Sequence, residues 1–351
     1  MLPPDSARIR AAYDKVCRTL LDRRTSAGHW VGRLSDSALS TATAVSALVI
    51  HNADAHQTHI RQAVDWLLAH QNSDGGWGDT AKSFSNISTT LLVKSALLLA
   101  GTPVPANTDE YLDHAGGIAA IRKRYGKDQT FSVPILTNAA LAGLVEWKEI
   151  PQLPFELAAL PMAWFRFVKM NVVSYAIPAL VAIGQVRFHF FHEKRKFIRN
   201  FVRRLVKKQT LRLIQEMQPE SGGYLEAAPL TSFVVMSLSA MGLREHPIVT
   251  KGVRFLLDTV REDGSWSIDT NLATWVTTLS VNALGKESFT AEESEQLVDW
   301  ILSCQHTERH PFTGASPGGW GWTNLSGAVP DADDTSAALL ALAKETKNDT
   351  M

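Results

Sequence analysis

The stretch VDWLLAHQNSDGGWG, residues 64–78, decides the fold of this chain. It joins the end of an amphipathic helix to Gln71, a polar turn and the pair Gly76 and Trp77. Near-copies of this stretch recur along the chain, and a recurring unit of this kind is the signature of a repeat architecture.

Four other stretches carry the same pattern with small departures. The Gln and the Trp are both kept, with a longer turn between them, in LVDWILSCQHTERHPFTGASPGGWGW. Tyr replaces the Trp in LIQEMQPESGGYLE. The Gln is absent from KGVRFLLDTVREDGSW and CRTLLDRRTSAGHWVG. The positions that match Gln71 and Trp77 are Gln305 and Trp320, Gln218 and Tyr224, Val260 and Trp266, and Arg24 and Trp30.

A second apolar helix, opened by Ser and Thr, follows each aromatic residue. These segments read STATAVSALVIHN, SNISTTLLVKSALLLAG, PLTSFVVMSLSAMGL, ATWVTTLSVNALG and DDTSAALLALAKE. Strand signals are weak throughout, and adjoining copies lie about 42 to 54 residues apart. The sequence therefore predicts an all-α protein of helix pairs stacked into a solenoid or closed ring, in which the Gln amide satisfies helix-end groups and the indole packs over it.

The composition is that of a soluble globular protein. Of 351 residues, 45% are hydrophobic and 20% are charged, with 35 basic against 35 acidic residues. This balance argues against wholesale binding of nucleic acid. Two cysteines, Cys17 and Cys304, are too few for a disulfide scaffold, the N-terminus lacks the apolar core of a signal peptide, and no uncharged apolar run reaches ~18 residues.

Three aspartates crowd into VPDADDTSAALLALA, residues 329–343, immediately before a predicted helix. A helix start favours negative charge by ~0.3–1 kcal/mol per residue, so Asp331, Asp333 and Asp334 are consistent with a capped surface helix. One or two acids suffice for that purpose, however. Where like charges share a site, one pKa is raised strongly, so an acid that keeps its proton is the alternative interpretation.

The repeats and the acidic cluster together resemble the class II terpene cyclases, most closely the squalene–hopene cyclases. The resemblance is carried by PGGWGWTNLSGAVPDADDT at 317–335, ATWVTTLSVNAL at 273–284 and HAGGIAAIR at 114–122, and it extends over nearly the whole chain. Members of that family continue for a long stretch beyond the acidic motif, whereas this sequence stops 17 residues after Asp334. We therefore expect a truncated protein, one half of a split enzyme, or helices with another purpose.

The resemblance implies two α/α double-ring (toroid) domains, one inserted into the other. The inserted domain is expected over residues 35–267 and looks complete. The host domain is expected over residues 1–34 plus 268–351, and it lacks the helices that would close its ring.

The resemblance also implies the roles of site residues. Asp333 is the expected proton donor, with Asp331 and Asp334 positioning and polarising it, and the histidine that supports this acid in the family has no match here. No cofactor or metal ion is implied. The substrate and carbocation pocket is expected to include aromatic residues, for which core packing is the alternative role; they are Trp322, Trp275, Tyr175 and Trp320.

Metal chemistry has little support in the sequence. The Asp-Asp-x-x-Asp array of class I terpene synthases is absent, and Cys304, His306 and His310 fit the long turn before Trp320 better than a zinc site.

Residues 187–212, RFHFFHEKRKFIRNFVRRLVKKQTLR, contain ten Lys and Arg against one acid, Glu193. Phe197, Phe201 and Leu205 recur on one helix face, a pattern that fits a solvated helix, a nucleic-acid patch or an interfacial membrane anchor. Because a polyprenyl alkene resides in the bilayer, we favour a cytoplasmic protein held peripherally on the inner face of the membrane, with no nucleic-acid partner.

The function that follows is proton-initiated cyclisation of a linear polyprenyl alkene, squalene being the best candidate. A second polypeptide that completes the catalytic domain is a possible partner. Two alternatives stay open: a cyclase of a prenyl diphosphate, and a non-catalytic helical-ring protein that binds an isoprenoid or a partner.

Overall fold

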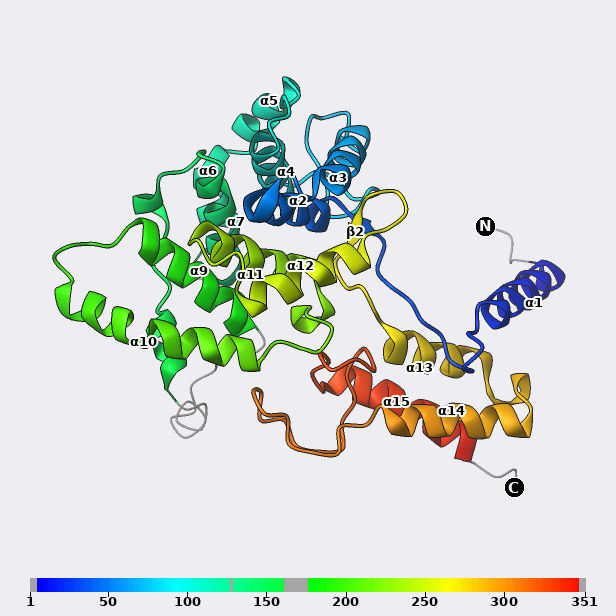
Figure 1. The fold of residues 1–351 in the computed structure, drawn as a ribbon. Coiled ribbons are helices and arrows are strands. Elements are labelled where there is room, and N and C mark those ends of the chain that lie inside the picture. Colours follow the sequence, from blue (N-terminus) through cyan, green and yellow to red (C-terminus); the bar gives the residue numbers. More distant parts are fainter. Residues whose placement is uncertain (1–4, 127–128, 161–175, 347–351) are drawn as a thin grey trace. The chain divides into compact units, whose positions relative to one another are not determined.

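A computed structural model describes residues 5–126, 129–160 and 176–346 of the chain. Helices make up the fold (Figure 1), and the strands among the described residues are two residues long each, β1 (Asp36–Ser37) and β2 (Trp266–Ser267). The all-α prediction is confirmed. The chain divides into two compact units, which we call the ring unit (Leu34–Thr270) and the split unit (Met1–Arg33 with Asn271–Met351).

Five helices form the centre of the ring unit. α2 (Ala38–Asn52) packs on α4 (Ile87–Leu99) and on α11 (Ala228–Ala240). α4 packs on α7 (Gln129–Leu141), α7 packs on α9 (Ile177–Phe190), and α9 packs on α11. Each of the five thus contacts two others in turn, and together they close an inner ring.

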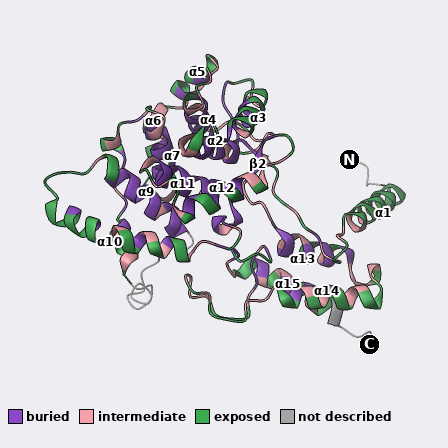
Figure 2. Cartoon of the chain, viewed as in Figure 1, coloured by how far each residue is buried: buried purple, intermediate pink, exposed green. Residues whose placement is uncertain are grey.

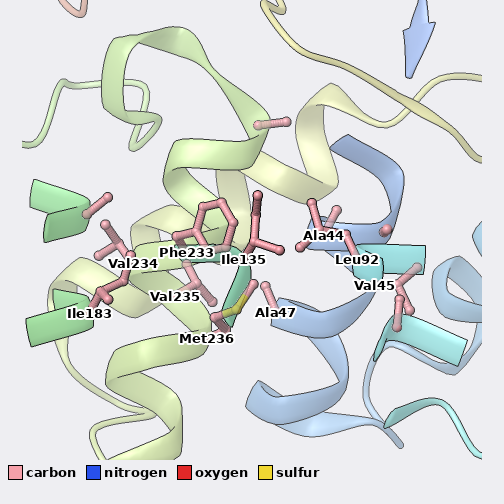
Figure 3. Close-up of a cluster of buried hydrophobic side chains, with 14 of the residues drawn as sticks. Ala44, Val45, Ala47, Leu92, Ile135, Ile183, Phe233, Val234, Val235 and Met236 are labelled. Carbon is pink, nitrogen blue, oxygen red and sulfur yellow. The ribbon is translucent and has the colours of Figure 1, made fainter. Parts of the chain in front are cut away.

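The sequence explains why these helices lie inside. Their residues are small or apolar on every side, and a helix without a polar face is one that is buried all round. Figure 2 shows them as mostly buried, and Figure 3 shows side chains from all five meeting in one cluster. Two buried hydroxyl groups bond the carbonyl four residues earlier: Thr41 Oγ1 donates to that of Ser37 at 2.7 Å, and Ser95 Oγ donates to that of Leu91 at 2.7 Å.

Outer helices cover this ring, and a short strand pair joins the two ends of the unit. α3 packs on α2, α5 and α6 on α4, α10 on α9, and α12 on α11. β1 pairs with β2 in antiparallel register, Ser37 opposite Trp266. The outer elements are α3 (Gln57–Ala69), α5 (Asn107–His114), α6 (Gly117–Tyr125), η1 (Trp147–Glu149), η2 (Phe155–Ala159), α10 (Phe197–Glu216), η4 (Tyr224–Glu226) and α12 (Pro247–Thr259).

The split unit has a smaller core built around its last helix. α15 packs on both α13 and α14, and the core gathers Trp30, Trp320 and aliphatic side chains from these helices, whereas α1 buries none of its residues. Within the described ranges of the whole chain, no helix combines the length and the apolarity needed to cross a membrane. The elements of the split unit are α1 (Ser6–Asp22), α13 (Ala273–Leu284), η5 (Lys286–Ser288), α14 (Ala291–Ser303) and α15 (Ala332–Thr346).

Candidate active site

The repeat builds the same hydrogen-bonded turn five times. In each copy a buried aromatic side chain donates to a backbone carbonyl near the end of the preceding helix, which satisfies one of the orphan acceptors found there. The acceptor lies ten residues upstream in four copies and nineteen upstream in the copy with the long turn. The donor–acceptor pairs are Trp30 Nε1 to Leu20 (2.8 Å), Trp77 Nε1 to Leu67 (2.7 Å), Tyr224 Oη to Ile214 (2.7 Å), Trp266 Nε1 to Leu256 (2.8 Å) and Trp320 Nε1 to Ile301 (2.7 Å).

The Gln of the repeat holds the turn together. Gln71 Nε2 donates to the carbonyl of Gly75 at 2.8 Å, Gln218 Nε2 to that of Gly222 at 2.9 Å, and Gln305 Nε2 to that of Gly318 at 2.9 Å.

Arg24 takes the same place in the first copy. Its Nε donates to the carbonyl of Gly28, and its Nη1 donates to Glu293 Oε1 at 2.8 Å. The guanidinium also lies 5.7 Å from the ring centroid of Trp30, within the range of a cation–π contact. The Arg24 side chain therefore replaces the missing amide donor of the repeat.

The longest of these turns, which ends at Trp320, precedes the acidic cluster at the start of α15. Asp331 lies opposite Trp320 in a single antiparallel bridge, in which its N–H donates to the Trp320 carbonyl at 3.0 Å. The Asp331 carboxylate then caps the helix, because its Oδ1 accepts from the Asp334 N–H at 2.8 Å. Thr335 Oγ1 accepts from the Trp320 N–H at 3.0 Å, which fixes the turn against the helix.

The three aspartates meet different environments. Asp331 and Asp333 are exposed, whereas Asp334 is buried, with 6% of its surface accessible. Burial is the largest cause that raises the pKa of Asp334, to about 7, and a hydrogen bond with the Asp331 side chain and the charges of Asp331 and Asp333 act in the same direction. Asp334 Oδ1 is also a buried oxygen with no hydrogen-bond partner among the described residues. A carboxyl in this position holds a proton near neutral pH.

The raised pKa belongs to Asp334, the neighbour of the central aspartate that is expected to donate the proton. Asp334, Ala338 and Ala341 are all buried, and their spacing of i, i+4 and i+7 places them on one helix face. The spacing is visible in the sequence, but the alanines and leucines around these residues offer several apolar helix faces. The role of Asp333 as proton donor stays a prediction.

The expected pocket aromatics lie in three situations. The Trp275 N–H donates to the Trp322 carbonyl at 3.0 Å, and both side chains are half-buried, with Trp322 Nε1 buried and unpaired among the described residues. Trp320 is 1% exposed and packs in the core of the split unit, which favours the core role over the pocket role. Tyr175 lies outside the described residues.

The residues considered for zinc belong to the long turn. Cys304 Sγ donates to the Trp300 carbonyl at 3.2 Å, and His310 Nδ1 accepts from the Thr313 N–H at 3.2 Å. In the part of the chain that the structure describes, no group of three or more His, Cys, Asp or Glu side chains is arranged to hold a metal ion.

Comparison with known proteins identifies two domains in the chain. The Squalene-hopene cyclase N-terminal domain matches residues 13–189, and the Prenyltransferase alpha-alpha toroid domain matches residues 267–349. The second match begins close to Asn271, where the second segment of the split unit starts, and it includes all three aspartates.

Individual relatives carry terpene cyclase names. A terpene cyclase-glycosyl transferase fusion protein of Humicola fuscoatra is 25% identical over 97% of this chain and 31% of its own length. Sporulenol synthase of Bacillus subtilis is 30% identical over 43% of this chain and 26% of its own length, and squalene hopane cyclase of Aspergillus fumigatus is 28% identical over 46% and 21%. The chain thus spans less than a third of the length of these relatives. Because the first domain covers half of the chain, this protein belongs to the squalene–hopene cyclase family, and its helices form the α/α toroid type of fold.

Proposed function

We propose that this chain supplies the acid of a class II terpene cyclase, which closes a linear polyprenyl alkene into rings after protonating it. The observation that carries this proposal is the buried carboxyl of Asp334, whose pKa is raised to about 7 beside Asp331. An ordinary carboxylic acid is fully ionised at neutral pH, so a cluster that retains one proton is the first requirement of such chemistry.

In the proposed reaction Asp333 delivers the proton. It is an exposed member of the cluster, whereas Asp334 is buried. The Asp333 O–H bond breaks, the proton bonds to one alkene carbon, and the neighbouring carbon becomes a tertiary cation that the next double bond attacks. Loss of a proton from the final cation ends the cascade and restores the acid. The charges of Asp331 and Asp333 help to raise the pKa of Asp334, so the proton of the cluster is held by interactions among all three residues.

Trp275 and Trp322 are proposed to stabilise the cations formed on the way. A backbone hydrogen bond joins the two residues, and both are half-buried. An aromatic face contributes ~0.5–2 kcal/mol to a nearby cation, more where water is excluded.

Squalene is the proposed substrate, in line with the name of the Aspergillus fumigatus relative, and a prenyl diphosphate is the alternative. We propose that the protein works at a membrane surface, because such an alkene dissolves in the bilayer, and that another polypeptide completes the split unit. Partner binding without catalysis is the second candidate function, and it is favoured by the exposed apolar face of α15, where Leu339 and Leu340 are 55% and 61% exposed.

The test is cyclisation of squalene by the purified chain, alone and together with a polypeptide carrying the remaining toroid helices, with products followed by mass spectrometry. We expect Asp333→Asn to abolish the product and Asp334→Asn to reduce it by about 100-fold or more. Asp299→Asn, an exposed aspartate on α14 of the same unit, is the matched control and should leave the yield unchanged. Equal product from all three variants would exclude the proposed acid.

A further inference from the structure

Three helices of the ring unit enclose a small cavity. α4, α5 and α6 each pack on the other two and lie side by side in Figure 1. The space between them measures about 210 Å³ and is partly open to solvent. An apolar cavity of about 150 Å³ is large enough to hold benzene, so this one has room for a single ring or a six-carbon chain.

The turn between α5 and α6 leaves this space unfilled. Gly116 and Gly117 follow one another there with φ values of +91° and +59°, which glycine adopts far more readily than a residue with a side chain. Gly117 lines the cavity, and no atom of another described element lies within 4 Å of the position that a Cβ on it would take. The two helices are therefore joined by a tight turn that carries no side chain into the gap.

Buried aliphatic side chains form the wall of the cavity. Leu91 of α4 is 4% exposed, Leu112 of α5 is 8% exposed and Ile121 of α6 is 0% exposed. On α4, Ile87, Leu91 and Lys94 have the spacing i, i+4 and i+7 and so share one helix face. The cavity thus combines an apolar wall with a charged group, which is typical of pockets that bind small molecules.

Three charged groups line the same cavity, and their sum is negative. Lys94 Nζ forms an ion pair with Asp109 Oδ1, so these two charges offset each other. Asp113 lies one helical turn further along α5 and is exposed, and its carboxylate has no ion pair and no hydrogen bond among the described residues. One negative charge is therefore left for a ligand.

We infer that this cavity binds a small alkylammonium or cycloalkylammonium compound, with its apolar body against the aliphatic wall and its ammonium on the Asp113 carboxylate. A ligand carboxylate would meet the unpaired charge of Asp113 and would have to displace Asp109 from Lys94, so a cation is the better match. The inference goes beyond the proposed cyclisation and stands apart from it, because this site belongs to the ring unit and the aspartate cluster to the split unit.

The test is a titration of the full chain at pH 7, followed by ligand-detected NMR, with three probes of equal chain length: hexylamine, hexanol and hexanoate. Hexylamine is protonated at this pH, as a lysine side chain is. We expect it to bind with a Kd of about 1 mM or below, as its size allows. It should bind about fivefold more tightly than hexanol, the factor that an exposed ion pair contributes, and hexanoate should bind more weakly than hexanol.

Two substitutions separate the charge from the wall. Asp113→Asn should weaken hexylamine binding about fivefold and leave hexanol binding unchanged. Leu144 is half-buried and lines the cavity, so Leu144→Trp should fill the space and weaken the binding of both probes by about tenfold or more. The matched controls on α3 of the same unit, Asp65→Asn and Leu68→Trp, replace exposed residues and should bind like the wild type.

Circular dichroism of each variant checks that the fold is intact, and if Leu144→Trp does not fold, the exposed Asp113 still decides the question. Hexanoate binding as tight as that of hexylamine would assign the site to anions and overturn the inference. No binding of hexylamine at about 10 mM, an unchanged affinity in Asp113→Asn, or an equal loss in Asp65→Asn would each overturn it as well. Hexylamine binding without any cyclised product would count against the proposed function alone.

Discussion

The buried carboxyl of Asp334 makes the stability of this protein depend on pH in a specific direction. Its pKa in the folded protein is about 7, against an ordinary value of 3.8. Between these values the folded state keeps a proton that the unfolded state has released. The stabilisation is therefore complete below the unfolded pKa and is lost as the pH rises through about 7.

The magnitude follows from the size of this shift. A difference of about three pKa units at ~1.4 kcal/mol per unit sets an upper value of about 4 kcal/mol for the stability lost between about pH 4 and pH 8. Asp334→Asn keeps the size of the side chain and stays neutral, so the variant should lack this loss. Urea unfolding of the wild type and the variant across that range measures the difference, which should grow with pH in favour of Asn.

Asp299→Asn again provides the control, because the exposed side chain of Asp299 on the same unit should give a stability difference that hardly changes with pH. If the free energy of unfolding of Asp334→Asn differs from that of the wild type by a constant amount from about pH 4 to pH 8, the assignment of a retained proton to Asp334 is refuted.

Three further substitutions test the turns of the repeat by urea unfolding. Tyr224→Phe removes the donor of the Ile214 carbonyl without changing the packed ring, and we expect a loss of about 1–3 kcal/mol; an unchanged midpoint would count against a stabilising hydrogen bond. Arg24→Ala should cost about 1 kcal/mol more than Arg24→Gln, since only Gln restores a donor for the Gly28 carbonyl, and equal midpoints would contradict this. Gly75→Ala should cost about 2 kcal/mol or more, because Gly75 has a φ of +87° and the added Cβ would lie 2.4 Å from the carbonyl oxygen of Asn107; a wild-type midpoint would show that the turn can move aside.

Local pattern was enough to predict the helix pairs of this fold. The turn at Trp77 is specified by local sequence, because the Gln, the Gly and the aromatic residue lie within about fifteen residues of one another and are joined by hydrogen bonds within that stretch. The sequence shows that Arg24 stands where the repeat has Gln, but it does not show that Arg24 does the work of the Gln. Arg24 donates to the Gly28 carbonyl as Gln does, but its second partner, Glu293, is distant in the sequence.

The burial of one aspartate of the cluster depends on tertiary packing. Asp333 and Asp334 are adjacent in the sequence, so composition and spacing treat them alike, and only the rotation of α15 against α13 and α14 buries one and exposes the other. The buried positions of Ala338 and Ala341 mark the face of α15 that turns inward. The run of alanine and leucine around them makes several apolar faces equally plausible from the sequence.

The exposure of Asp333 links its activation to whatever covers α15. A carboxylic acid protonates an alkene only where water is excluded, and the Asp333 side chain is exposed in the described structure. Leu340, seven residues further along, lies on the same helix face and is 61% exposed. An apolar segment that covers Leu340 would also remove water from Asp333. Under the proposed function, the covering of α15 and the removal of water from Asp333 are one event, so cyclisation should depend on a covering segment far more than on any single substitution in the ring unit.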